Sequence, residues 1–176
     1  MRLRPYIHTS DHSYLEKWID SERVHALWCA NLIPYPMSEE DLRNLLEKDA
    51  QEWGGHAYVA TEGSGIPVGF LVYSVNSQTN SAFLKFVILT PALRGKGYGR
   101  QMIKLVLEHI FKEAKVSSVQ LNVFDVNDKA KACYESIGFI ERSVEEGVFE
   151  YKNEKWGRRN MVISQKQFIS PYVLWE

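Results

Sequence analysis

The sequence predicts an α+β fold, in which helices flank a mixed and mainly antiparallel sheet of six to seven strands. First, apolar runs at residues 57–61, 67–75 and 83–89 are joined by short polar or glycine-containing turns, as in an antiparallel meander. Second, the run at 83–89 is followed by an amphipathic helix at about 100–115 and a strand at 118–124. That order is a βαβ unit with a right-handed crossover, so its two strands should be parallel.

Length and charge set limits on the organisation. A chain of 176 residues suits a single domain, which we place at residues 1–166. Residues 167–176 are unusually apolar, and we expect this tail to pack on the body of the domain or on a partner subunit, which leaves a homodimer open. The formal net charge of −1 argues against non-specific nucleic-acid binding. The sequence shows no N-terminal signal region and no apolar run of membrane-spanning length, so we expect a cytoplasmic protein with no membrane partner.

No residue pattern predicts a metal site. Cys29 and Cys133 lack the spacing of metal ligands, and two reduced thiols are favoured over one disulfide. His8 and His12 stand near the start of the first helix, but no acidic partner lies at a telling spacing. We therefore predict that they are surface histidines.

The N-terminal region predicts an edge strand followed by a helix. Residues 2–7 form the strand, at or near a sheet edge because Pro5 has no N–H group to donate. Thr9, Ser10 and Asp11 then offer caps for the first helix.

Two further helices are expected before the meander. Residues 21–29 continue in helical conformation, and a proline-containing loop follows. Ser38 then caps a helix in which Asp41 holds the capping-box position. This helix should end near Gly54.

The rest of the chain is organised around the turn that joins the strand at 83–89 to the amphipathic helix. The turn is basic and rich in glycine, and it reads Arg94, Gly95, Lys96, Gly97, Tyr98, Gly99 and then Arg100. The first N–H groups of a helix have no internal partner, and glycines let the backbone approach an anion closely. We interpret the turn as a diphosphate cradle. Its residue order fits neither a Walker A loop nor a Rossmann loop, so ATP and dinucleotides are disfavoured.

A second group of residues follows the second parallel strand. Asn127 should cap a helix at 128–136, and Gly138 lies just beyond its end. Asn127 and Tyr134 share one face of this helix, with the small Ala130 between them, which leaves room for a slender ligand. The phenol of Tyr134 has an unperturbed pKa of about 10, so at neutral pH it is a proton donor.

The C-terminal region predicts three short strands, at 139–142, 147–152 and 160–165. The segment 153–157 should form the hairpin loop between the last two.

Two motifs carry a resemblance to a known family. The Arg94-x-x-Gly97-x-Gly99 pattern resembles the coenzyme A pyrophosphate loop of the GNAT superfamily of acyl-CoA-dependent N-acetyltransferases. Residues 127–139 resemble the NxxAxxxYExxGF signature of the same family, and the order of elements agrees. The resemblance implies a transferase that moves the acetyl group of acetyl-CoA to a primary amine by direct attack in a ternary complex. It also implies a parallel strand pair that splays in the middle of the sheet.

The resemblance also implies roles for individual residues. Tyr134 would be the general acid that protonates the coenzyme A thiolate, and Asn127 would contact the pantetheine arm. The backbone at the end of the first parallel strand would pair with the pantetheine amides and supply an oxyanion donor. The cofactor-binding residues implied in this way are Val87, Ile88, Leu89, Arg94, Gly95, Lys96, Gly97, Tyr98, Gly99, Arg100 and Asn127.

The general base and the acceptor are not indicated. Many members of the family carry a glutamate in one of the two parallel strands, but neither residues 82–85 nor 121–123 contain a carboxylate. A water chain lined by Asn122, Tyr73 or His56 is one substitute. The missing carboxylates also keep open a non-catalytic acyl-CoA-binding or regulatory module. A third alternative is an unrelated nucleotide-binding α+β protein.

Acceptor recognition in the family usually falls to residues equivalent to 28–37 and 150–157. Candidates for a pocket wall are Trp28, Tyr35 and Trp156, and candidates for attracting an ammonium group are Glu40 and Glu150. Loop packing and ordinary solvation explain each of them equally well. The sequence therefore leaves the amine open between small molecules and peptide N-termini. The nearest resemblance within the family is to a bacterial group that includes ribosomal-protein alanine acetyltransferases and diamine acetyltransferases.

Overall fold

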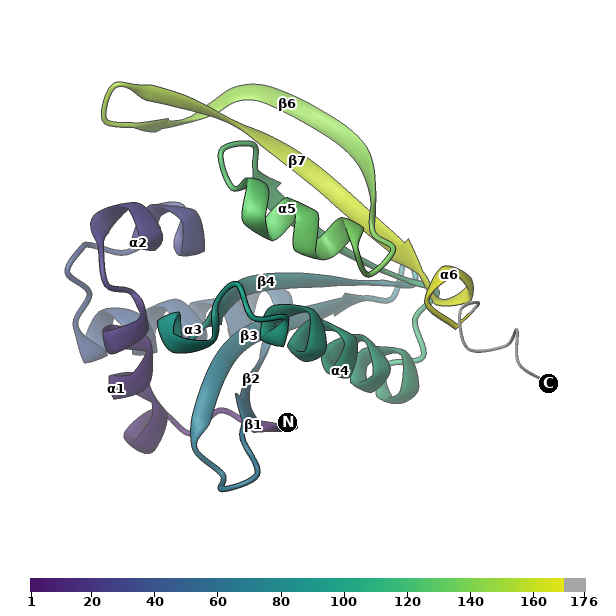
Figure 1. Ribbon diagram of the computed structural model, residues 1–176, viewed down its shortest axis with the longest axis horizontal. Coiled ribbons are helices and arrows are strands. Elements are labelled where there is room, and N and C mark those ends of the chain that lie inside the picture. Colours follow the sequence, from purple (N-terminus) through teal and green to yellow (C-terminus); the bar gives the residue numbers. More distant parts are fainter. Residues whose placement is uncertain (170–176) are drawn as a thin grey trace. The chain divides into compact units, whose positions relative to one another are not determined.

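The computed structural model describes residues 1–169 (Figure 1). The strands are β1 (Arg2–Pro5), β2 (His56–Thr61), β3 (Pro67–Asn76), β4 (Ser81–Leu89), β5 (Ser118–Phe124), β6 (Ile140–Tyr151) and β7 (Glu154–Ser164). The helices are α1 (His8–Trp18), α2 (Glu22–Cys29), α3 (Glu39–Trp53), α4 (Tyr98–Glu113), α5 (Asp128–Glu135) and α6 (Gln165–Ile169), and a short 3₁₀ turn, η1 (Pro91–Leu93), precedes α4.

The strands form one seven-stranded sheet in the order β1-β2-β3-β4-β5-β7-β6. β1 with β2, β2 with β3, β5 with β7, and β6 with β7 are antiparallel pairs, whereas β4 and β5 are parallel. The register of the parallel pair stops at Leu84 and Leu121, although β4 continues to Leu89 and β5 to Phe124, as a splayed pair requires. The predicted α+β class, the strand number and the parallel central pair are thereby confirmed.

Backbone contacts divide the chain into two compact units, and each is described by itself. The first comprises Met1–Ser74 and Lys85–Leu105, and the second comprises Val75–Leu84 and Val106–Glu176. The single domain predicted for residues 1–166 stays a prediction.

The core of the first unit gathers one side of α1, α2 and α3 with β2, β3 and the end of β4. Its buried members are Leu15, Trp18, Ile19, Trp28, Cys29, Leu42, Leu45, Val59, Phe70, Val72 and Ile88. Removal of this apolar surface from water is the main term that stabilises the unit. Because the core reaches Ile88, it also holds the end of β4, which leads into the glycine turn.

Two helix starts in the first unit test the predicted caps. The capping box at α3 is confirmed, since Ser38 Oγ accepts from the N–H of Asp41 and the Asp41 carboxylate accepts from the N–H of Ser38. The caps predicted for α1 are wrong, because that helix already begins at His8, after Ile7. Asp11 instead lies within the first turn of α1, where its Oδ2 accepts a hydrogen bond from the N–H of Ile7 at 2.8 Å.

The C-terminal hairpin of the second unit differs from its prediction. β6 is one continuous strand, not two, and it pairs along its length with β7 (Figure 1). Register shifts between Glu141 and Ser143 and between Glu145 and Phe149 accommodate its extra residues, so the polar stretch does not end the strand. The turn is tight, at residues 152–153, and the predicted loop at 153–157 is mostly strand.

The predicted apolar tail lies largely outside the described residues. Within α6, Phe168 is buried, and its ring centroid lies 5.6 Å from that of Phe111 in α4. The start of the predicted tail thus packs on the second unit. Residues 170–176 are not described, so the remainder of that prediction is untested.

Candidate active site

The glycine turn of the first unit has the backbone that the diphosphate interpretation needs. Gly95 and Gly97 both adopt positive φ angles, 72° and 82°, which side-chain-bearing residues rarely adopt. A Cβ atom added to either would meet nothing within 4 Å, so backbone conformation and not space calls for glycine there. α4 begins at Tyr98, and its first N–H groups have no partner within the helix. These residues are exposed apart from the half-buried Gly99, so the amides are open to an anion.

The basic side chains of the turn also hold it in place. The Nε of Arg94 donates to the Leu89 carbonyl at 3.0 Å, and its NH2 donates to the Trp18 carbonyl at 2.8 Å. Burial lowers the pKa of Arg94, and the nearby Asp20 opposes that effect. Lys96 Nζ donates to the Ala92 carbonyl at 2.9 Å. Arg94 therefore ties the turn to the ends of β4 and α1, a positioning role that sequence reasoning did not anticipate.

The end of β4 is distorted at one residue. Phe86 has a φ of 51°, a left-handed conformation that is rare for a bulky residue within a strand and typical of a β-bulge. Its carbonyl accepts from Trp28 Nε1 at 2.9 Å. Ile88 and Leu89, which follow the distortion, have buried side chains, so any role in binding falls to their backbone. No pattern in the sequence signals this distortion, because phenylalanine is an ordinary strand residue.

The second unit carries the predicted asparagine and tyrosine. Asn127 caps α5, with its Oδ1 accepting from the N–H of Ala130 at 3.3 Å. Because that bond uses the amide oxygen, the NH₂ group is the end that suits a carbonyl of a ligand. Tyr134 is 8% exposed and packs edge-on against Phe139, with ring centroids 5.7 Å apart. Burial raises the pKa of Tyr134, and the neighbouring Cys133 adds to the rise, so the hydroxyl keeps its proton at neutral pH.

Two aromatic candidates for an acceptor pocket are core residues. Trp28 is 7% exposed and is committed to the Phe86 carbonyl. Trp156 is fully buried in the second unit, where its ring contacts Phe124, Phe149 and Tyr151. The predicted pocket-wall role is therefore wrong for both, because each side chain supplies apolar contact area to the core of its own unit.

Tyr35, the third candidate, does line a hollow in the first unit. This open hollow has a volume of about 390 Å³ and is lined by Glu22, Asn31, Leu32, Ile33, Pro34 and Tyr35. Its lining includes a carboxylate, an amide and an aromatic ring, a combination that can receive an ammonium group. Sequence reasoning identified this loop but missed Glu22, which belongs to the preceding helix.

The residues suggested for a water chain are divided between the units. In the first unit the His56 and Tyr73 rings lie 5.6 Å apart, with His56 exposed and Tyr73 buried. In the second unit Asn122 Oδ1 accepts from Asn160 Nδ2 at 2.9 Å. The side chain that hydrogen-bonds to Asn122 is therefore another amide, Asn160, and not a carboxylate.

Comparison with known proteins identifies the family. Residues 15–139 match the family model described as the acetyltransferase (GNAT) family. That match covers most of the chain, and the chain belongs to this family. The membership confirms the family prediction and, with it, the predicted class, an acyltransferase that uses acetyl-CoA as co-substrate.

Curated relatives extend the comparison. The chain is 26% identical over 140 residues to the spermidine N(1)-acetyltransferase of Vibrio cholerae, a match that covers 78% of this chain and 79% of that protein. It is 24% identical over 107 residues to the uncharacterized prophage-derived N-acetyltransferase YokL of Bacillus subtilis, over 61% of this chain and 60% of that one. A Bacillus subtilis spermine/spermidine N(1)-acetyltransferase is 26% identical over 98 residues, or 52% and 64% of the two chains. The chain thus spans less than two thirds of two of these three relatives.

Solved structures support the fold. The spermidine N-acetyltransferase from Vibrio cholerae, in a structure that contains CoA and spermine, superimposes with a TM-score of 0.81 at 23% identity, covering 95% of this chain and 96% of that one. At this identity the likeness concerns the fold alone. Among the described residues, no helix is both long enough and apolar enough to cross a membrane. The cytoplasmic location stays a prediction.

Proposed function

We propose that this chain transfers the acetyl group of acetyl-CoA to a primary amine by direct attack in a ternary complex. The observation that carries the proposal is the pair of left-handed glycines immediately before α4, in the motif position of a coenzyme A pyrophosphate loop. In this proposal the pyrophosphate binds the backbone of residues 94–100. Arg94 keeps that loop in shape through its two carbonyl bonds.

The backbone of Val87, Ile88 and Leu89 is proposed to bind the pantetheine arm. These residues follow the left-handed Phe86, and the register between β4 and β5 has already ended at Leu84. A strand edge without a neighbour can pair with the amides of an extended ligand, as an added strand would. Asn127 would meet the same arm through its amide NH₂ group.

Tyr134 is the proposed general acid. The amine nitrogen bonds to the thioester carbon, the carbon–sulfur bond breaks, and the departing thiolate takes the phenol proton. Burial raises the pKa of Tyr134, so the hydroxyl is protonated at neutral pH and has a proton to give. The proton that the amine loses goes to water, which His56 and Tyr73 are candidates to orient.

A polyamine is the acceptor class that we favour. Two of the curated relatives described above carry spermidine or spermine in their names. The hollow beside Tyr35 and Glu22 offers an acidic and aromatic surface to such a cation. Peptide N-termini remain the competing class. A homodimer remains a prediction.

The proposal is tested in two stages. Acetyl-CoA at 100 times its dissociation constant should stabilise the protein by about 2.7 kcal/mol, which a thermal shift detects. ATP and NAD serve as controls, and protection by either of these without protection by coenzyme A would favour an unrelated nucleotide-binding protein. A thiol-release assay with spermidine, spermine, a diamine and a peptide then finds the acceptor. Binding of acetyl-CoA without turnover on any amine would favour the non-catalytic module instead.

Replacing Tyr134 by Phe separates the acid role from binding. We expect the turnover number to fall by about 10²–10⁴-fold, as for loss of a general acid, while the dissociation constant of acetyl-CoA stays within a few fold. Cys133→Ser, a neighbouring change on the same helix, is the matched control. Unchanged turnover in Tyr134→Phe would remove this residue from the chemistry.

A further inference from the structure

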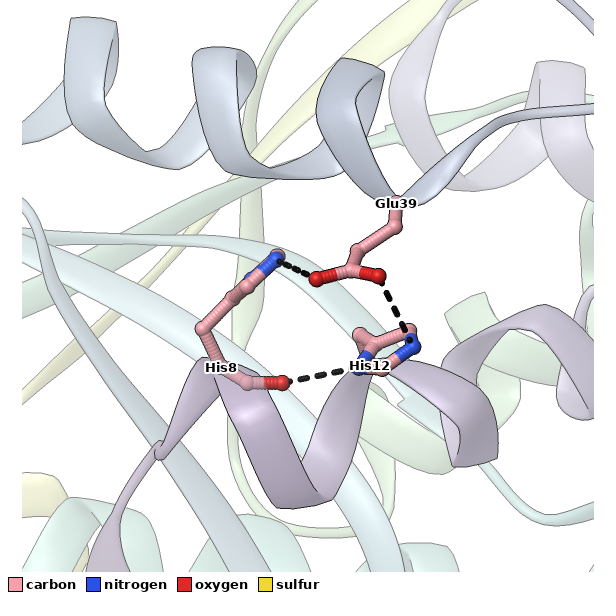
Figure 2. A group of neighbouring side chains, drawn as sticks. All are labelled: His8, His12 and Glu39. Atoms are coloured by element: carbon pink, nitrogen blue, oxygen red, sulfur yellow. Dashed lines mark hydrogen bonds and ion pairs between the residues drawn. The ribbon is translucent and has the colours of Figure 1, made fainter.

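Two histidines and a glutamate converge at the start of α1 and α3, within the first unit (Figure 2). His8 and His12 lie one helical turn apart on α1, and Glu39 is the first residue of α3. His8 Nε2 lies 3.3 Å from Glu39 Oε1, and His12 Nε2 lies 3.5 Å from Glu39 Oε2. The histidine side chains are only 19% and 21% exposed, so the prediction of surface histidines without an acidic partner is wrong.

The other ring nitrogens determine what these atoms offer. His12 Nδ1 lies 2.9 Å from the His8 carbonyl oxygen, which can only accept, so Nδ1 carries the hydrogen. In a neutral ring, Nε2 of His12 then presents a lone pair to the carboxylate of Glu39. Two acceptors facing each other at this distance require a proton or a cation between them.

His8 presents its Nε2 to the same carboxylate. Its Nδ1 lies 3.1 Å from the Tyr6 hydroxyl, which can accept from a protonated Nδ1 as well as donate to a bare one. Its Nε2 is buried, and within residues 1–169 no hydrogen bond satisfies it. Buried polar atoms are normally bonded, so a nitrogen of this kind that faces a carboxylate calls for a partner.

The distances suit a tetrahedral metal ion. Ligand atoms that each lie about 2.0–2.1 Å from a tetrahedral zinc ion are separated by about 3.3–3.4 Å. His8 Nε2 lies 3.3 Å from one oxygen of the Glu39 carboxylate and His12 Nε2 lies 3.5 Å from the other, and one ligand atom from each residue lies within 4.8 Å of the other two.

The groups around the three ligands are also those of a zinc site. Each histidine has its Nδ1 oriented by an oxygen, from Tyr6 or from the His8 backbone, which fixes Nε2 as the ligand atom. Glu39 Oε1 accepts from Arg43 NH2 at 2.9 Å, which orients the carboxylate and leaves Oε2 for the metal. The guanidinium of Arg43 is a positive charge close to the site, so it should weaken the binding of a cation.

We propose that His8, His12 and Glu39 bind a zinc ion, with water in the fourth position. The ion joins the start of α1 to the first turn of α3, two segments of the same unit. None of the three residues belongs to the proposed acetyl-transfer machinery, so this proposal stands or falls independently of it. The nitrogen ligands select zinc over magnesium, which prefers oxygen.

The test uses the full chain, stripped of metal with a chelator and titrated with Zn²⁺ against a chromophoric competitor. Wild type should bind one equivalent, and Co²⁺ should give the intense visible absorption of a tetrahedral site. His12→Gln and Glu39→Gln should each weaken zinc binding about tenfold or more. His109→Gln, a histidine on α4 outside the cluster, should bind as wild type does. Arg43→Gln should bind at least as tightly.

Circular dichroism checks that every variant is folded, and a melting curve with zinc adds a second readout. Zinc should raise the melting temperature of wild type and of His109→Gln but not of His12→Gln. Mg²⁺ should leave all of them unchanged. The proposal is overturned if wild type takes up no zinc under these conditions, or if folded His12→Gln and Glu39→Gln bind it as wild type does. In either case the cluster is a contact of two histidines with a glutamate and holds no metal.

Discussion

Replacing Trp28 by Phe should loosen the distorted end of β4. The indole N–H donates to the Phe86 carbonyl at 2.9 Å, and Phe86 is held in a left-handed conformation. Such a conformation persists only where its surroundings impose it. The substitution removes the donor but keeps an aromatic ring next to Phe70 and Phe86, whose centroids lie 6.4 and 5.6 Å from that of Trp28.

The size of the effect follows from the bond that is lost. A hydrogen bond of this kind contributes about 0.5–1.5 kcal/mol net, and leaving a buried carbonyl without its partner costs about 1–3 kcal/mol. Phe86 is half-buried, so water can replace the indole only in part. We therefore expect the free energy of unfolding to fall by about 1–3 kcal/mol.

Urea denaturation followed by circular dichroism measures this change, because the signal does not depend on the tryptophan being replaced. Trp53→Phe is the control: Trp53 is 66% exposed, and its change should stay within about 0.5 kcal/mol. If the end of β4 binds acetyl-CoA, the KM for acetyl-CoA should also rise in Trp28→Phe and not in the control. A Trp28→Phe protein as stable as Trp53→Phe would show that the indole bond does not hold Phe86 in its left-handed conformation.

Three further predictions concern stability. Burial alone would raise the pKa of Asp11, but hydrogen bonds from Arg4 and from the Ile7 N–H lower that pKa below its ordinary value. The contribution of Asp11 to the free energy of unfolding is therefore fully present above the unfolded pKa of about 3.9. It is lost as the pH falls through the lower pKa of the folded state. Asp11→Asn should cost about 1.5–3 kcal/mol at pH 7 in urea unfolding and much less at pH 2; an equal cost at both pH values would contradict this. Gly69→Ala should cost about 1–3 kcal/mol, because its Cβ would collide with the Met102 sulfur and lie 3.3 Å from the Ile88 carbonyl; a smaller residue at 102 should restore stability, and failure to do so would point to the backbone. Ser38→Ala should lower the melting temperature by removing about 1 kcal/mol, whereas no change would mean that the Asp41 side chain caps α3 alone.

Local patterns are sufficient to predict several elements. The capping box at Ser38 and Asp41, the cap at Asn127 and the turn at Gly95 and Gly97 depend on contacts or φ angles within a few residues, and all of them occur as the sequence indicates. The α+β class also follows from local periodicity and element order. A hydrophobic period needs only the side chains of one element, so it can be read without the rest of the fold.

Where contacts between residues distant in sequence determine the structure, local patterns predict the wrong structure or predict nothing. The sequence predicts a hairpin loop at residues 153–157, although Trp156 lies in β7 and is completely buried, because the pairing of β7 with a continuous β6 outweighs the polar composition of residues 141–146. In the sequence, Phe86 looks like an ordinary strand residue. The hydrogen bond that its carbonyl accepts comes from the indole of Trp28, which is distant in sequence.

Sequence alone predicts the fold class and the glycine turn, since each depends on residues that act on their immediate neighbours, and its two motifs point to the family. Only the folded chain shows that Arg94 ties the turn to the ends of β4 and α1. Folding also brings Glu39 to His8 and His12, although the sequence separates the glutamate from the two histidines. The physical reason is the same in both cases: hydrogen bonds and metal ligands depend on distances in space, and the packing of the first unit sets those distances.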